Sequence, residues 1–306
     1  MKKRLNVICT FLMMIMLLTS AFAHICIISY ADSDTEKINN EENEEENSDD
    51  IVAESYSTNV DFTGSGIGFT SFLYDNSSGL PTSEANSIAQ TSDGFIWIGS
   101  YSGLIRYDGI DFERFDSSTG IASVVSLYVD SKDRLWIGTN DNGVAVYEKG
   151  EFTVYGQVEG LNSYSIRAMV EDLDGNIIIA TTQGMAYVDT NNEFHLINEP
   201  QINNEYVCEL RMGPNGVIYG ENLDGSIFTI ENRKVTAYYS SKDIGFGNIN
   251  CIYPDPDNAG YVYLGTDESE VIYGNIENGF KDSKIVSVYP QVNINAINCI
   301  DGIIWH

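Results

Sequence analysis

The sequence predicts an all-β protein, a β-propeller built from four-stranded antiparallel blades. One phrase recurs six times: a Gly- or Asp-rich turn followed by a short apolar strand with a large residue inside it. The anchor residues of the six copies are Trp97, Trp136, Ile178, Tyr219, Tyr263 and Trp305, and the steps between them are 39, 42, 41, 44 and 42 residues. A period near forty residues, made of short strands, is typical of a propeller.

The first complete repeat shows how a blade forms. We expect strands over 87–90, 95–99, 104–107 and 112–115, separated by turns rich in Gly and Asp. Gly94 supplies the positive φ that a tight hairpin needs. The central strands are apolar on consecutive residues, which fits sheets that pack on both faces. Because the runs are short and rich in Ile, Val and Tyr, the pattern favours strands over a buried helix.

The repeats organise residues 61–306. The expected units are about 79–116, 120–156, 160–198, 203–240 and 247–290, with a truncated one at 292–306. Residues 69–74 match the outer strand of the first unit but have no blade of their own, and propellers use such a strand to complete the last blade. We therefore expect an open ring of about five blades plus the start of a sixth, in the N-terminal part of a longer protein.

Anchors and cysteines are expected in the core. The anchor side chains should fill the gaps between adjacent blades, with ligand stacking as the alternative. Cys251 and Cys299 both sit in an Ile-Asn-Cys-Ile context, so we expect equivalent core positions on neighbouring blades. With Cys208 they make an odd set, which does not indicate a disulfide framework.

The first 31 residues predict export. Lys2, Lys3 and Arg4 precede an apolar run over 5–18, and small-residue cleavage sites follow near residues 23 and 31. No charged residue lies between Arg4 and Asp32, a stretch of 27 residues, so an uncleaved signal anchor is the alternative to a signal peptide. In either case the rest of the chain is expected outside the cytoplasm, associated with the cell membrane in the full-length protein.

An acidic tether follows, over residues 32–60. Residues 32–54 carry eleven acids, one base and no aromatic side chain, so they cannot bury enough apolar surface to offset the entropy of ordering. The whole chain has a net charge of −29, of which −22 lies after residue 54. This charge disfavours nucleic acid as a partner.

A search for catalytic chemistry finds no candidate. The three histidines are His24, His195 and His306, and no Ser-His-Asp arrangement or metal-ligand spacing can be assembled from them. There is no Gly-Lys motif for phosphate. We therefore expect no catalytic residue, metal site or cofactor in this chain.

Candidate binding residues come from the topology. In a propeller, the turns between second and third strands share a face with the connections between blades, and rigidly held loops favour binding. The side chains placed there are Tyr101, Asn140, Asp141, Asn162, Tyr164, Gln183 and Glu268. Their amide, carboxylate and aromatic groups suit a neutral polar ligand such as a sugar. The alternative is that they are ordinary hydrophilic turn residues.

The first two units resemble a known repeat. Gly79-Leu80-Pro81, the segments 86–90, 93–99 and 103–109, and then 135–139 in the next unit, are similar to the two-component regulator propeller repeat. The resemblance implies a bacterial membrane sensor with one or two seven-bladed propellers, an immunoglobulin-like stalk, a transmembrane helix and a cytoplasmic output. It implies an output of the hybrid histidine kinase or diguanylate cyclase type.

The function expected from these features is a sensory ectodomain, not an enzyme. It would bind an extracellular small molecule or glycan and control a cytoplasmic output, as a homodimer formed through C-terminal parts beyond this sequence. One alternative is an exported propeller enzyme, a lyase or glycosidase, which would gather acids or a histidine on one face. The other is a passive adhesion or scaffold propeller.

Overall fold

The computed structural model describes residues 74–75, 79–82, 84–156, 160–288, 292–300 and 303–305. The predicted export segment, the tether, His306 and all but Tyr74 of the expected strand over 69–74 lie outside this range. Tyr74 itself packs on the first blade, where its hydroxyl lies 3.2 Å from that of Tyr107 and its ring contacts Phe112. No helix within these residues is long and apolar enough to cross a bilayer.

Five four-stranded antiparallel sheets follow one another along the chain, and each is built from four consecutive strands. Blade 1 comprises β1 (Ser87–Gln90), β2 (Ile96–Ser100), β3 (Gly103–Tyr107) and β4 (Phe112–Phe115). Blade 2 comprises β5 (Val124–Val129), β6 (Leu135–Thr139), β7 (Val144–Glu148) and β8 (Glu151–Gly156). Blade 3 comprises β9 (Ile166–Glu171), β10 (Ile177–Thr181), β11 (Gly184–Val188) and β12 (Phe194–Ile197).

The last two complete sheets keep the same order. Blade 4 comprises β13 (Val207–Met212), β14 (Ile218–Asn222), β15 (Ile227–Glu231) and β16 (Lys234–Tyr239). Blade 5 comprises β17 (Ile249–Pro254), β18 (Tyr261–Thr266), β19 (Glu270–Asn275) and β20 (Lys284–Ser287). A hairpin of β21 (Asn298–Ile300) and β22 (Ile303–Trp305) follows, and the short helices are η2 (Ser117–Thr119) and α2 (Ser241–Ile244).

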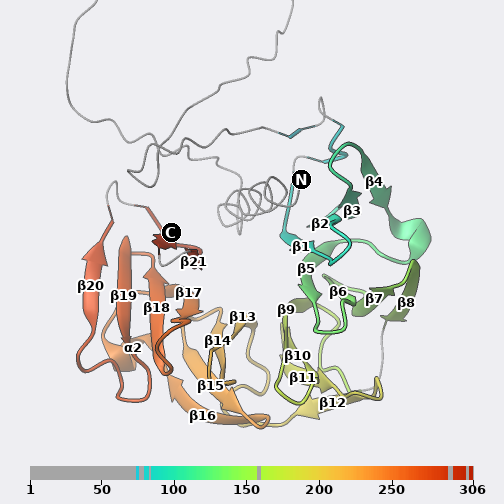
Figure 1. Ribbon diagram of the computed structural model, residues 1–306. Coiled ribbons are helices and arrows are strands. Elements are labelled where there is room, and N and C mark those ends of the chain that lie inside the picture. The colour runs from blue at the N-terminus through green and yellow to red at the C-terminus, as the bar shows by residue number, and fades with distance from the viewer. Residues whose placement is uncertain are drawn as a thin grey trace, which may run out of the picture.

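The blades form an open arc around a common axis (Figure 1). The first strand of each blade, β1, β5, β9, β13 or β17, lies on the central side, and the fourth strand lies at the periphery. Inner strands of successive blades contact each other along the arc. The prediction of an all-β, incomplete propeller is therefore confirmed.

Anchor side chains pack between successive blades. Trp97 is fully buried in one cluster with Val124 and Leu135 of blade 2. Trp136 is fully buried with Ile166 of blade 3. Each ring is buried between two neighbouring sheets. The apolar surface that is thereby removed from water supplies much of the free energy that holds the sheets together.

The later anchors, which are smaller than tryptophan in blades 3 to 5, also lie in or beside the interfaces between blades. Ile178 and Tyr219 are buried in the next two interfaces. Tyr263 is only half-buried, against the cluster that contains Cys251. Trp305 pairs with Asn298 in the β21–β22 hairpin, and its side chain lies outside the described residues.

The cysteines in the described residues are free thiols. Cys251 is buried, whereas Cys208 and Cys299 are half-buried. Cys251 opposes Gly265 in the β17–β18 ladder, while Cys299 opposes Ile304 in the terminal hairpin.

On the face opposite to the predicted ligand loops, neighbouring blades are joined by serine–carboxylate contacts. The backbone N–H and the hydroxyl of Ser92 donate to the two carboxylate oxygens of Asp133, at 2.7 and 2.6 Å. Ser131 donates in the same way to Glu171, at 2.7 Å for both bonds. These contacts fix the spacing of blades 1, 2 and 3 at the β1–β2, β5–β6 and β9–β10 turns.

Candidate functional site

The candidate site lies where the turns between second and third strands meet the connections between blades. In blade 2, the N–H of Asn140 donates to Ser123 O at 2.9 Å, and the N–H of Gly143 donates to Tyr164 O at 2.9 Å. In blade 5, the N–H of Asp267 donates to Asn248 O at 3.0 Å. Turn and connection are therefore held together on one face, here called the turn face, as the topology requires.

Most of the predicted ligand residues are exposed on this face. Tyr101 is 56% exposed at the β2–β3 turn. Asn140 is half-buried, whereas four of the others are exposed; these are Asp141, Asn162, Gln183 and Glu268. Tyr164 differs, because its half-buried ring packs against the cluster around Trp136.

The structure brings Asn140 together with a residue that sequence reasoning did not select, Arg167. Nη2 of Arg167 donates to Asn140 Oδ1 at 2.9 Å and to Ser165 Oγ at 2.8 Å. The guanidinium carbon lies 5.1 Å from the centroid of the Tyr206 ring, a cation–π arrangement. Blades 2 and 3 and the connection into blade 4 thus converge on one half-buried arginine.

Tyr101 of blade 1 lies on the same face, at the β2–β3 turn. The pKa of the Tyr206 phenol is raised, mainly by burial; the Cys208 thiol and the Tyr101 phenol add to the rise, while the charge of Arg167 opposes it. We call Tyr101, Asn140, Ser165, Arg167 and Tyr206 the arginine cluster.

Arg167 owes its position to a β-bulge. In the β9–β10 ladder, Ala168 opposes Ala180 and Ile166 opposes Thr181, so Arg167 has no partner of its own. The same interruption occurs in blades 2, 4 and 5, and the extra residues there are Val125, Cys208 and Asn250. Bulges re-aim a side chain and are common beside functional sites. Four inner strands therefore present one unpaired residue each near the turn face.

Blade 4 adds two acids to this region. Glu209 and Glu221 oppose each other in the β13–β14 ladder. Glu209 accepts from Arg211 Nε at 2.7 Å and from the N–H of Ile252 at 3.1 Å. Glu221 is 4% exposed, and its pKa is raised well above the ordinary value by burial first and by the charges of Glu209 and Asp224 second. Burial therefore favours the neutral form of Glu221.

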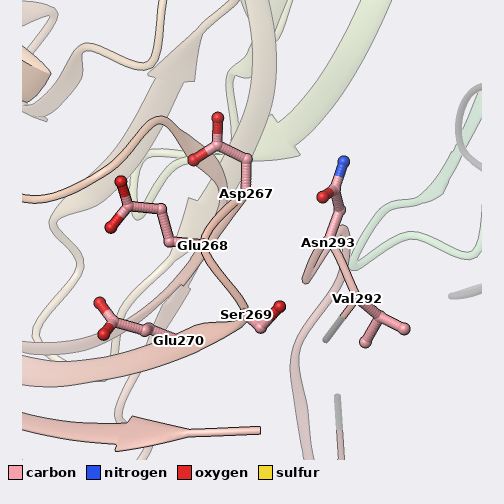
Figure 2. A pocket seen from close by; sticks show the side chains of 6 residues that line it. All are labelled: Asp267, Glu268, Ser269, Glu270, Val292 and Asn293. Carbon is pink, nitrogen blue, oxygen red and sulfur yellow. The ribbon is translucent and has the colours of Figure 1, made fainter. Parts of the chain in front are cut away.

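A hollow of about 460 Å³ opens at the β18–β19 turn. Figure 2 shows the carboxylates of Asp267, Glu268 and Glu270 around it, with Ser269, Val292 and Asn293 on the other walls. It contains one predicted ligand residue, Glu268. Its walls are mainly polar, unlike the largely apolar lining of a typical small-molecule pocket.

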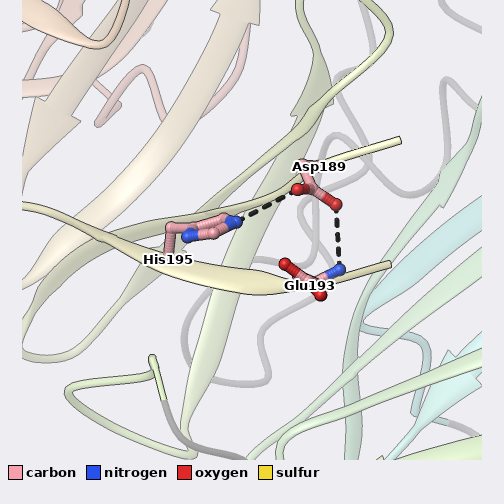
Figure 3. Close-up of side chains that lie close together, drawn as sticks. All are labelled: Asp189, Glu193 and His195. Carbon is pink, nitrogen blue, oxygen red and sulfur yellow. Dashed lines mark hydrogen bonds and ion pairs between the residues drawn. The ribbon is translucent and has the colours of Figure 1, made fainter. Parts of the chain in front are cut away.

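A second cluster lies at the β11–β12 turn. Asp189, Glu193 and His195 each offer a ligand atom within 4.8 Å of the others (Figure 3). Asp189 accepts from the N–H of Glu193 at 3.0 Å and lies 3.2 Å from His195 Nε2. The sequence search missed this grouping because it looked for paired histidines. Hydrogen bonds of the hairpin turn account for the arrangement.

One signal in the sequence could have found the arginine cluster. Arg167 is the one basic residue inside the otherwise apolar or small start of an inner strand, as comparison with Val125, Cys208 and Asn250 shows. Charged side chains are rarely buried in a strand unless they are paired with another group. The bulge itself has no local signature, because it is defined by pairing with the next strand.

Two segments of the chain match the family model described as "Two component regulator propeller", residues 79–102 and 120–141. These segments run from the entry of blade 1 to its β2–β3 turn, and over the same part of blade 2. A search of curated proteins found no significant match.

Solved structures share the architecture at low identity. The extracellular domain assigned to the hybrid two-component system BT3049 of B. thetaiotaomicron is 21% identical over 76% of this chain, with a TM-score of 0.61. The corresponding domain of BT4673 is 19% identical over 76% of the chain, with a TM-score of 0.59. This chain covers 33% and 35% of those two domains.

An enzyme shares the architecture as well. A streptogramin B lyase is 18% identical over 69% of this chain and 72% of its own length, with a TM-score of 0.57. Identities this low show the common propeller architecture alone. The likeness to the two-component regulator propeller repeat lies in the two matched segments, residues 79–102 and 120–141.

Proposed function

We propose that this chain is the extracytoplasmic sensor propeller of a bacterial transmembrane receptor, and that it binds a polar extracellular ligand, a saccharide, on the turn face. The observation that carries the proposal is the arginine cluster. There, the phenol of Tyr206, the amide of Asn140, the hydroxyl of Ser165 and the guanidinium of Arg167 converge, and the exposed Tyr101 lies on the same face. Convergent polar groups on a rigid scaffold are what small-ligand sites share.

The family supports the sensory part of the proposal. Regulator propeller repeats occupy the start of the arc, and the two extracellular domains named above have the same architecture. Signalling would require that the ligand bind two arrangements of the receptor with different affinity, since a ligand shifts an equilibrium only by that difference.

The proposal is tested by ligand screening with matched variants. The protein is labelled and applied to an array of extracellular glycans, and hits are measured by calorimetry. Tyr101→Ala and Asn140→Ala should each weaken binding of a hit by about tenfold, the loss expected for one good contact. Tyr261→Ala and Asn191→Ala replace exposed residues of the same type on the opposite face, and should leave the affinity unchanged.

An exported enzyme remains the second candidate, because a lyase has the same architecture. Among the described residues, the one histidine, His195, lies on the outer strand β12 and pairs with Asp189. Incubation of the protein with each hit, followed by mass spectrometry of the glycan, separates the two functions. An unchanged glycan supports the sensor, whereas cleavage or elimination supports the enzyme.

A further inference from the structure

The guanidinium of Arg167 has only neutral partners among the described residues. The other arginines of the arc mostly pair with carboxylates, as expected in so acidic a chain; they are Arg106, Arg134, Arg211 and Arg233. Arg114 donates to a backbone carbonyl, Ser102 O, from an exposed outer strand. Arg167 is therefore the half-buried arginine of the described chain whose charge is not matched by an acid.

We propose that Arg167 binds an anionic group of the ligand, a carboxylate or sulfate carried by an acidic saccharide. The saccharide part of this inference rests on the proposed function, whereas the anion site stands on the geometry of Arg167 alone. The site would distinguish acidic sugars from their neutral counterparts, which a face of amides and phenols does not do by itself.

The guanidinium is already oriented. Asn140 Oδ1 and Ser165 Oγ hold Nη2, and the guanidinium carbon lies over the ring of Tyr206. Nε is buried and has no hydrogen-bond partner within the described chain. A buried donor without an acceptor is uncommon in native proteins. An oxyanion that reaches this edge would satisfy Nε through a charge-assisted bond, the strong kind that arginine makes with planar anions.

The described acids and the thiol near Arg167 do not neutralise its positive charge. Burial favours the neutral form of Glu221 by raising its pKa well above the ordinary value. The Cys208 thiol is neutral too, since burial raises its pKa to about 12. Glu209 is occupied by Arg211 and by the N–H of Ile252. The nearby acids therefore do not act as the missing partner.

The anion site is tested first with inorganic sulfate. Sodium sulfate is titrated into ¹⁵N-labelled protein against sodium chloride at equal ionic strength, and the arginine Nε–H resonances are followed by NMR. The Arg167 signal, assigned by its loss in Arg167→Gln, should shift and saturate with sulfate but not with chloride. Arg114, which donates to the backbone carbonyl of Ser102 on an exposed outer strand, serves as the internal control. Equal responses of both arginines, or none, would overturn the inference.

The ligand class is tested with matched sugars. Galacturonate and galactose oligomers of the same length are compared by calorimetry against the wild type, Arg167→Gln, Arg167→Lys and Arg114→Gln. We expect Arg167→Gln to lose about tenfold to a hundredfold in affinity for the acidic oligomer, as for one charged hydrogen-bonded contact. Affinity for the neutral oligomer should fall much less than affinity for the acidic one, and Arg114→Gln should behave as wild type. Arg167→Lys keeps the positive charge and shows whether the planar guanidinium, with its several N–H donors, is needed for binding. It also serves as the second variant if Arg167→Gln folds poorly.

The outcomes separate the two proposals. Sugar binding that depends on Tyr101 but not on Arg167 supports the proposed function and overturns the anion site. A saturable sulfate response without any sugar binding supports the anion site and overturns the saccharide ligand. Equal affinity of wild-type protein for acidic and neutral oligomers overturns the discrimination proposed here.

Discussion

The indole Nε1 of Trp136 donates a 2.8 Å hydrogen bond to Asp130 Oδ2, and so the polar atom of a buried anchor is satisfied within its own blade. Its ring meanwhile packs against blade 3. The same relationship recurs in blade 1, where Trp97 Nε1 donates to Thr91 Oγ1 at 3.0 Å. Asp130 also accepts from Arg134 Nε at 2.6 Å, and its side chain is fully buried.

Removing this carboxylate should destabilise the fold. Asp130→Ala leaves the Trp136 N–H and the Arg134 guanidinium without their acceptor, which we expect to lower the free energy of unfolding by about 2–3 kcal/mol at pH 7. Urea unfolding measures the change. Asp141→Ala, an exposed turn residue of the same blade, should stay within about 0.5 kcal/mol of wild type. Equal losses in the two variants would contradict the role given to Asp130.

The contribution of Asp130 should depend on pH. Burial opposes its ionisation, but hydrogen bonds from Trp136 and Arg134 outweigh burial, so the pKa of the carboxyl is lowered. A lowered folded-state pKa gives stability that is complete above the unfolded-state value of about 4 and is lost as pH falls through the folded value. The stability gap between wild type and Asp130→Ala should therefore narrow below about pH 4. Urea midpoints measured from pH 7 to strong acid check this, and a constant gap would count against it.

The pH dependence of stability that Glu221 contributes should be opposite in sign to that of Asp130. Burial raises its pKa, so between the unfolded-state value of about 4.3 and the higher folded value the folded protein binds more protons. Stability should fall as pH rises through this window. Glu221→Gln removes the ionisable group, so the variant should gain on the wild type steadily as pH increases above about 4. The slope of unfolding free energy against pH is the readout; parallel slopes for both proteins would refute the assignment.

The anchor ring itself should matter more than its hydrogen bond. Trp136 is fully buried, and Trp136→Ala should lower the free energy of unfolding by about 3–5 kcal/mol through lost burial and the cavity left behind. Trp136→Phe keeps much of the packing and loses the N–H, so its loss should be clearly smaller. Thermal and urea unfolding of both variants distinguish the two contributions. An unchanged melting temperature for the Ala variant would show that the ring does not join the blades.

A glycine next to the inner strands sets how closely blades 2 and 3 approach. A Cβ on Gly138 would lie 2.7 Å from Ile166 Cγ2 and would also meet Ser126 Oγ. Gly138→Ala should therefore lower stability by about 1–3 kcal/mol through overpacking. The matched position in blade 3 already holds Ala180, so Ala180→Gly tests the reverse change. A neutral Gly138→Ala in urea unfolding would mean that the interface relaxes at no cost.

The repeat could be predicted from the sequence because its causes are local. Turn glycines such as Gly94, short β-branched strands and the anchors Trp97 and Trp136 each carry their own signal. The strand positions of blade 1 follow from these signals nearly residue by residue, with β2 observed at Ile96–Ser100. Burial of the anchors in the interfaces follows from their size.

The sequence singles out Arg167 alone; its neighbours in the arginine cluster could not be predicted, because the causes of their convergence are not local. Asn140 and Arg167 are 27 residues apart and meet only because blades 2 and 3 stack. The bulge that frees Arg167 exists in the ladder with β10, not in β9 alone. Tyr164 illustrates the converse, since an aromatic residue in a loop suits a ligand site or a core equally well, and here its ring packs on the core.

The row of bulges has a consequence for how the chemistry of the turn face can change. Four inner strands carry the same backbone irregularity at the same height, yet its residue is a valine, an arginine, a cysteine or an asparagine. What the repeats retain is the defect in the ladder, and the side chain placed on it is free to differ. A single substitution at one of these positions can therefore alter the chemistry of the turn face while the ladder on either side of the bulge stays paired.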